Sequence, residues 1–83
     1  MVRGSKIETT IGLCVVALSK FLMKKYGISE EEAYQHLMEM DLYELLLDVE
    51  TRLYLETNEF LIQCCELECD KGKDALYRFI SID

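Results

Sequence analysis

The sequence predicts an all-α fold, a compact bundle of four short helices followed by a fifth short element. Three observations lead to this fold class. The 83 residues include no proline and only four glycines, so residues that interrupt helices are scarce. Apolar residues recur at helical spacing along most of the chain. The helix-capping pattern Ser-x-x-Glu occurs at Ser5 and again at Ser29.

The length of the chain fits one domain. We expect a single helical domain over residues 6–83. The opening residues 1–5, MVRGS, resemble the remnant of an expression vector, and we expect them to be disordered or vector-derived.

The first helix is predicted over Lys6–Lys25. Ser5 and Glu8 form the capping box at its start, and Gly27 supplies the left-handed residue that ends it. Its inward stripe is Ile7, Ile11, Cys14, Leu18, Phe21 and Leu22. Gly12 in mid-helix marks either a close approach of another helix or no contact at all.

The second helix has the clearest boundaries. Ser29 is the expected N-cap, Glu32 completes the capping box, and the helix ends near Met40. The residues expected to face inward are Ala33, Leu37 and Met40.

The third helix, Asp41–Leu55, is predicted to be the central packing helix of the bundle. Its sequence, DLYELLLDVETRLYL, is the most hydrophobic run of the chain in which the polar residues still recur at helical spacing. Asp41 and Glu44 are placed to cap its start. Its apolar stripe is wide, so we expect it to contact neighbours on more than one side.

Arg52 is the single cation within residues 30–70. On a continuous helix, Asp48 and Glu56 would lie one turn before and one turn after it. We interpret this spacing as a solvent-exposed ladder of charges, because two carboxylates already neutralise the guanidinium. The alternative is an arginine held for a ligand anion.

A fourth helix is predicted over Phe60–Cys69, capped by Thr57 or Asn58 and closed by Gly72. The tail, Ala75 to Ile80, is read as a fifth short helix in preference to a strand, because a lone strand needs a partner.

The formal net charge of −7 is unevenly distributed, since residues 30–70 carry thirteen acids and one cation. Such a segment repels phosphate backbones, so we expect no nucleic-acid binding. No apolar run is long enough to span a membrane. We interpret the acidic surface first as one that keeps the protein soluble, and the alternative is that it attracts a basic protein partner. The candidate partner-binding residues are Glu30, Glu31, Glu39, Glu44 and Asp48.

The four cysteines are predicted to be free thiols, because adjacent or one-turn neighbours are poor disulfide partners. Free thiols favour a cytoplasmic location. The alternative is a zinc site or a small cysteine-dependent enzyme. Its candidate ligands are Cys64, Cys65, Cys69 and His36. The usual C-x2-C spacing is absent, so we expect no metal, no cofactor and no catalytic residue.

The order of these features resembles a family of small bacterial proteins catalogued as domain of unknown function 3791. The resemblance covers Lys6 to Leu67 and rests on KIETTIGLCVVAL, YGISEEEAYQHL, DLYELLLDVETRLYL and ETNEFLIQCCELE. The chain has Leu55-Glu56-Thr57 where members often carry a His-Thr pair, and its C-terminal DKGKDALYRFISID has no clear counterpart. The family has no established active site. Its members are often encoded beside toxin-like proteins, which implies an antitoxin-like or regulatory partner.

These observations favour a non-catalytic protein–protein interaction module of a bacterial cytoplasmic protein. The apolar surplus of the third and fourth helices exceeds what so short a chain can cover. We therefore expect a homodimer.

Overall fold

The computed structural model describes residues 2–81, with side chains from residue 7 onward. The described residues exclude residue 1 of the predicted N-terminal segment 1–5 and residues 82–83 of the predicted domain 6–83. The described part is all-helical, as predicted. Its elements are α1 (Val2–Tyr26), α2 (Glu30–Met38), α3 (Asp41–Leu47), two short 3₁₀ helices η1 (Val49–Thr51) and η2 (Leu53–Leu55), α4 (Asn58–Lys71) and α5 (Lys73–Ile80).

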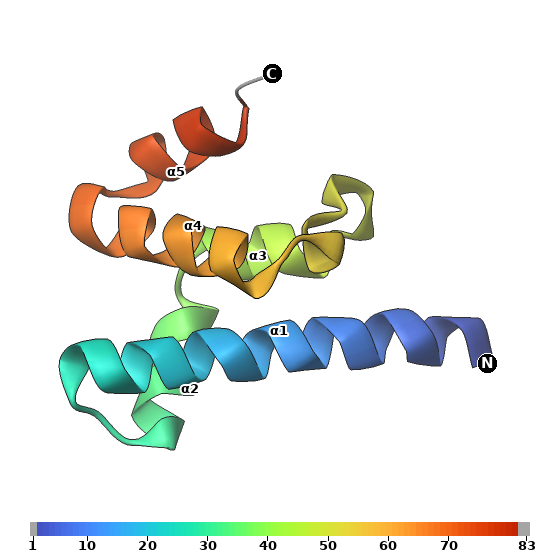
Figure 1. Ribbon diagram of the computed structural model, residues 1–83, viewed down its shortest axis with the longest axis horizontal. Coiled ribbons are helices and arrows are strands. Elements are labelled where there is room, and N and C mark those ends of the chain that lie inside the picture. Colours follow the sequence, from blue (N-terminus) through green and yellow to red (C-terminus); the bar gives the residue numbers. More distant parts are fainter. Residues whose placement is uncertain (1, 82–83) are drawn as a thin grey trace.

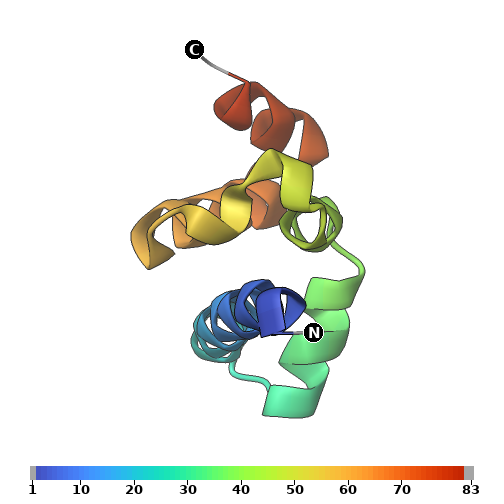
Figure 2. The same ribbon diagram turned by 90° about the vertical axis from the view of Figure 1, so that its right-hand side faces the viewer.

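The helices are arranged in three layers (Figures 1 and 2). The long α1 lies beside α2 in one layer, α3 and α4 with the 3₁₀ turns form the middle layer, and α5 covers the far side of α4. None of the described helices is long and apolar enough to cross a membrane.

The longest helix, α1, is the element that the others pack around, because it contacts α2, α3, α4 and η2. It begins at Val2, four residues before the predicted start, so Ser5 lies within the helix and is not its N-cap. The segment expected to be disordered or vector-derived thus supplies the first turn from residue 2 onward. The predicted inward stripe is confirmed at Ile11, Cys14, Leu18 and Leu22, which are buried.

The turn between α1 and α2 follows the predicted pattern. Gly27 adopts a left-handed φ of 63° and its N–H donates to the Met23 carbonyl at 2.8 Å. The Ser29 Oγ then accepts the Glu32 N–H at 3.2 Å, while the Glu32 carboxylate accepts the Ser29 N–H at 3.1 Å. This reciprocal pair is the capping box that the sequence predicted.

The predicted central helix Asp41–Leu55 is wrong beyond Leu47, where α3 ends. Local hydrogen bonds replace the next helical turn. The Thr51 hydroxyl donates to the Leu45 carbonyl at 2.7 Å, and the Asp48 carboxylate accepts the Glu50 N–H at 3.0 Å. Short polar side chains that bond nearby backbone compete with the helix in this way.

Arg52 is exposed and adopts a left-handed φ of 59°, which turns the chain between η1 and η2. The predicted charge ladder is therefore absent, because Arg52 shares no helix face with Asp48 or Glu56. Among the described residues, neither carboxylate forms an ion pair with it. The turn carries Leu53 back against α1, where its side chain is buried.

The start of α3 is capped by α4 and not by its own residues. Met40 is the N-cap and makes no side-chain hydrogen bond, so the predicted Asp41–Glu44 cap is not formed. Instead the Glu68 carboxylate accepts the N–H of Asp41 at 2.8 Å and of Leu42 at 3.0 Å. Helix starts leave backbone N–H groups unpaired, and this carboxylate satisfies two of them.

The last two helices confirm the prediction with longer bounds. The Thr57 hydroxyl caps α4 by accepting the Phe60 N–H at 3.1 Å, and Gly72 ends it at a φ of 97°. The tail is a helix, α5, whose Phe79 ring stacks on Phe60 with centroids 5.3 Å apart. The fully buried leucines of the core are Leu18, Leu22, Leu37, Leu42, Leu46, Leu61 and Leu76.

Candidate interaction surface

An apolar groove of about 550 Å³ lies between the N-terminal half of α1 and the residues of α2, α3 and η1 that face it. Successive inward turns of α1 form one wall, and Leu47 and Val49 form the other. Its lining residues are Ile7, Glu8, Ile11, Gly12, Val15, Tyr34, Tyr43, Leu47 and Val49. Leu47 and Val49 are each 47% exposed, so solvent covers much of this apolar wall.

Gly12 leaves open space on the α1 wall of the groove. A Cβ atom at this position would meet no atom within 4 Å. Within the described chain, no second helix approaches Gly12 closely, so this one of the two predictions for Gly12 is wrong. The position is instead free space on the groove surface.

Two tyrosines join α2 to α3 at the groove. The rings of Tyr34 and Tyr43 meet edge-to-face with centroids 6.4 Å apart, and their hydroxyl oxygens are 3.4 Å apart. This hydrogen bond, with burial, raises the pKa of Tyr43. The pair gives the groove a polar feature on an otherwise apolar surface.

The charged residues that line the groove, or that alternate with its lining residues around η1, are acidic. Glu8 lines it, and Asp48 and Glu50 alternate along the chain with the lining residues Leu47 and Val49. The two segments that build the groove, residues 7–19 and 26–51, contain no lysine or arginine. The groove therefore combines an apolar floor with an acidic margin.

The predicted partner-binding acids are exposed but do not form a single patch. Glu30 and Glu31 begin α2, Glu39 follows its end, Glu44 lies on α3, and Asp48 follows α3. The start of α2 and the middle of α3 lie in different layers of the fold (Figure 2). Asp48 is the member of this set beside the groove.

Further apolar side chains remain exposed outside the groove. On α1, Leu13 is 66% exposed and Val16 is 46% exposed, one turn further along the same helix. On η2, Leu55 is also 66% exposed. Leu13 and Val16 make α1 apolar on its outer side as well as toward the core.

The predicted metal ligands separate into two places. His36 and Cys69 line a depression of about 250 Å³ together with Tyr26, Glu39, Met40 and Glu68. Cys64 and Cys65 are fully buried in the core. Across the described residues, no group of three or more candidate ligands comes close enough to hold a metal ion.

His36 packs against α1 and shares the surface depression with the Cys69 thiol. Its ring meets Tyr26 edge-to-face with centroids 5.4 Å apart. Its Nε2 is buried without a hydrogen-bond partner among the described residues. A hydrogen bond to Cys69, with burial, raises the pKa of Tyr26 to about 12, so this hydroxyl stays protonated at neutral pH.

The buried thiols are poor nucleophiles. Burial raises the pKa of Cys64 to about 11, and it also raises the pKa of Cys65 and of Cys14. Thiolate is the reactive form of cysteine, and these three remain thiols at neutral pH. All four cysteines are free, as predicted.

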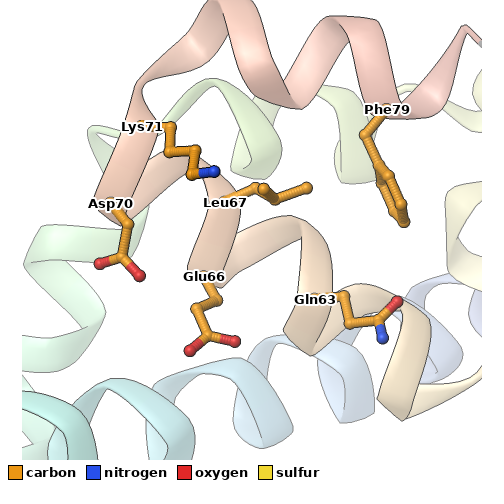
Figure 3. Close-up of a pocket in the computed structure, with 6 residues that line it drawn as sticks. All are labelled: Gln63, Glu66, Leu67, Asp70, Lys71 and Phe79. Atoms are coloured by element: carbon orange, nitrogen blue, oxygen red, sulfur yellow. The ribbon is translucent and has the colours of Figure 1, made fainter.

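A second depression, about 320 Å³, lies between side chains of α4 and α5 (Figure 3). Leu67 and Phe79 extend into it from the two helices, and the carboxylates of Glu66 and Asp70 point away from α5. Asp70 forms an ion pair with Lys25 at 3.1 Å, so this carboxylate is already used to join α4 to α1. The mixed charges give this depression no single chemical preference.

Sequence reasoning missed the groove, although it identified both of its walls as apolar. The signal lay in the spacing of Ile7, Ile11 and Val15, because Val15 widens the inward stripe of α1 that Ile7 and Ile11 begin. The premature end of α3 then places Leu47 and Val49 opposite that stripe.

Comparison with models of known families, with curated proteins and with solved structures finds no match to this chain.

Proposed function

We propose that this chain is a non-catalytic protein–protein interaction module. The observation that carries the proposal is the open apolar groove between α1 and α3, with Leu47 and Val49 nearly half exposed on its wall. Apolar grooves of this kind are characteristic of partner-binding surfaces, because covering them releases water from apolar area.

The chemistry of the remaining side chains supports binding over catalysis. A cysteine-based reaction needs a thiolate beside a base. Here Cys64 and Cys65 are buried with raised pKa values. Cys69 shares a surface depression with His36, but its hydrogen bond is to Tyr26, and the buried His36 Nε2 has no hydrogen-bond partner among the described residues. The zinc-dependent alternative draws no support from the described residues, in which the candidate ligands are divided between the core and a surface depression.

We propose further that the module forms a homodimer through the outer side of α1. Leu13 and Val16 are exposed on successive turns, so a second copy of α1 can pack along them. Standard interfaces bury about 800 Å² per partner. Neighbouring exposed side chains such as Thr9 and Lys20 would complete such an area.

Light scattering on the purified protein at micromolar concentration tests the dimer. We expect twice the mass of one chain. Leu13→Glu places a charge at the centre of the contact and should give the mass of one chain. Leu55→Glu is the matched control, because Leu55 is equally exposed at 66% but lies on η2. A monomeric native protein, or equal masses for the two variants, would contradict the α1 dimer.

We place this module in the bacterial cytoplasm, where its four free thiols stay reduced. Its partner is proposed to be the product of a neighbouring gene, as an antitoxin-like or regulatory protein would have. Co-expression with each neighbouring gene product, followed by purification of a defined complex, tests this assignment. Failure of every neighbour to co-purify would overturn it.

A further inference from the structure

We propose that the groove binds an amphipathic helix of a partner protein whose apolar face is flanked by lysine and arginine. This inference rests on the proposed function and specifies the chemistry of the partner. The groove is defined by the residues named above, between α1 on one side and Leu47 and Val49 on the other.

The shape of the groove suits a helix. Its volume is about 550 Å³, and its lining comes from α1 on one side and from α2, α3 and η1 on the other. Its α1 wall repeats at Ile7, Ile11 and Val15, so its apolar contacts are spaced by one helical turn. A docked helix presents side chains at i, i+3, i+4 and i+7, which match such a repeat.

Gly12 leaves open space on the α1 side of the groove, where a side chain of the partner can pack. No atom lies within 4 Å of the position where its Cβ would be, although Gly12 is in the middle of a long helix. Glycine in a helix interior costs about 1 kcal/mol relative to alanine. Stability of the fold alone would favour alanine at position 12, so the glycine and the open space beside it are not explained by folding.

The charge of the groove selects a basic partner. Glu8, Asp48 and Glu50 lie on or beside the lining, and the segments 7–19 and 26–51 contain no lysine or arginine. An acidic or neutral helix would meet like charges or none, whereas a basic helix gains attraction on both flanks. The same charges disfavour an anionic membrane surface or a nucleic acid.

Fluorescence anisotropy with designed peptides tests the proposal. The probe is a fluorescein-labelled helix of about 18 residues, with leucine at i, i+3, i+4 and i+7 and lysine elsewhere. The control peptide keeps the leucines and replaces every lysine by glutamate. We expect saturable binding of the lysine peptide, at least tenfold tighter than that of the glutamate peptide and weakened by salt.

Variants of the protein locate the binding site. Gly12→Leu fills the groove and improves helix propensity, so it should weaken lysine-peptide binding at least tenfold without unfolding the chain. Gln35→Leu adds the same side chain to an exposed position of α2 outside the lining and should leave binding unchanged. Glu8→Lys should weaken binding severalfold by reversing a charge of the groove.

The outcomes separate this inference from the proposed function. Equal binding of both peptides would overturn the basic partner but leave an apolar docking groove. Lysine-peptide binding that Gly12→Leu does not weaken would be general adsorption to an acidic surface, and would overturn the groove as the site. Absence of binding would overturn this inference alone, because the proposed interaction module is tested independently by the Leu13→Glu dimer measurement and by co-purification.

Discussion

Replacing Glu68 by alanine tests the contact that joins α4 to the start of α3. The Glu68 carboxylate accepts two backbone N–H bonds, at 2.8 Å from Asp41 and 3.0 Å from Leu42. Alanine removes both acceptors. The two N–H groups are then satisfied by water alone, at a helix start that has no side-chain cap of its own.

The loss can be estimated from the two bonds. A hydrogen bond to a charged group contributes about 1.5–3 kcal/mol, whereas loss of an exposed helix cap costs about 1 kcal/mol. Glu68 is half-buried, which places it between these limits. We expect Glu68→Ala to lower the free energy of unfolding by about 2 kcal/mol, and the midpoint temperature by about 10 °C for a chain of this size.

Urea and thermal unfolding, followed by far-ultraviolet circular dichroism at fixed protein concentration, measure this loss. Glu66→Ala is the matched control, because Glu66 lies two residues earlier on α4, is exposed and accepts no backbone bond in the described chain. Glu68→Gln keeps one acceptor oxygen and should lose about half as much as alanine. A loss below about 0.5 kcal/mol for Glu68→Ala, or one equal to that of Glu66→Ala, would refute the capping role.

Four further predictions concern the reactivity of the thiols, the pH dependence of stability, the left-handed residue and the α2 cap. With a thiol reagent at pH 8, only Cys69 should react rapidly in the folded protein, and rapid reaction of more than one thiol would contradict the burial of the others. The three slower thiols are Cys14, Cys64 and Cys65. Burial raises the pKa of Cys64 from 9.0 to about 11. The contribution of this thiol to the free energy of unfolding is therefore fully present below about pH 9 and is lost as the pH rises toward 11. Urea titrations across that range should show this loss. Arg52→Gly should raise the free energy of unfolding by about 0.5–1 kcal/mol, since glycine adopts the left-handed φ of 59° without strain, and a destabilised variant would argue against this strain. Ser29→Ala should lower the free energy of unfolding by about 1 kcal/mol through loss of the capping box, whereas Ser29→Asp should retain most of it.

Local signals predicted the parts of the fold that depend on nearby residues. The capping box at Ser29, the helix stop at Gly27 and the cap at Thr57 each involve atoms within a few residues, so their patterns are visible in the sequence. The inward stripe of α1 was predictable for the same reason, because helical spacing alone places Leu18 and Leu22 on one side.

The end of α3 could not be predicted from periodicity. Leu46, Val49 and Leu53 fit one continuous helical stripe as well as they fit a helix followed by two 3₁₀ turns. The decision depends on Thr51 and Asp48, whose side chains bond the local backbone, and on the burial of Leu53 against α1. The local hydrogen bonds and the tertiary contact together decide between the two structures, and periodicity reports neither.

The groove was beyond sequence reasoning for a related reason. It requires Leu47 and Val49 to lie opposite Ile11 and Val15, and that arrangement exists only because α3 ends early. Likewise, no local pattern indicates that Glu68 caps a helix that begins 27 positions before it in the chain. Contacts between distant segments decide both features.

The cap from Glu68 also sets an order of assembly. A seven-residue helix such as α3 is too short to persist alone in water, because helix initiation is unfavourable and few bonds follow it. The carboxylate that completes its first turn comes from the far end of α4, so we expect α3 to gain this stabilisation only after α4 has formed and docked. During folding, the amide protons of Asp41 and Leu42 should therefore gain protection from hydrogen exchange no earlier than those of α4. We therefore expect α4 to form before α3 becomes stable.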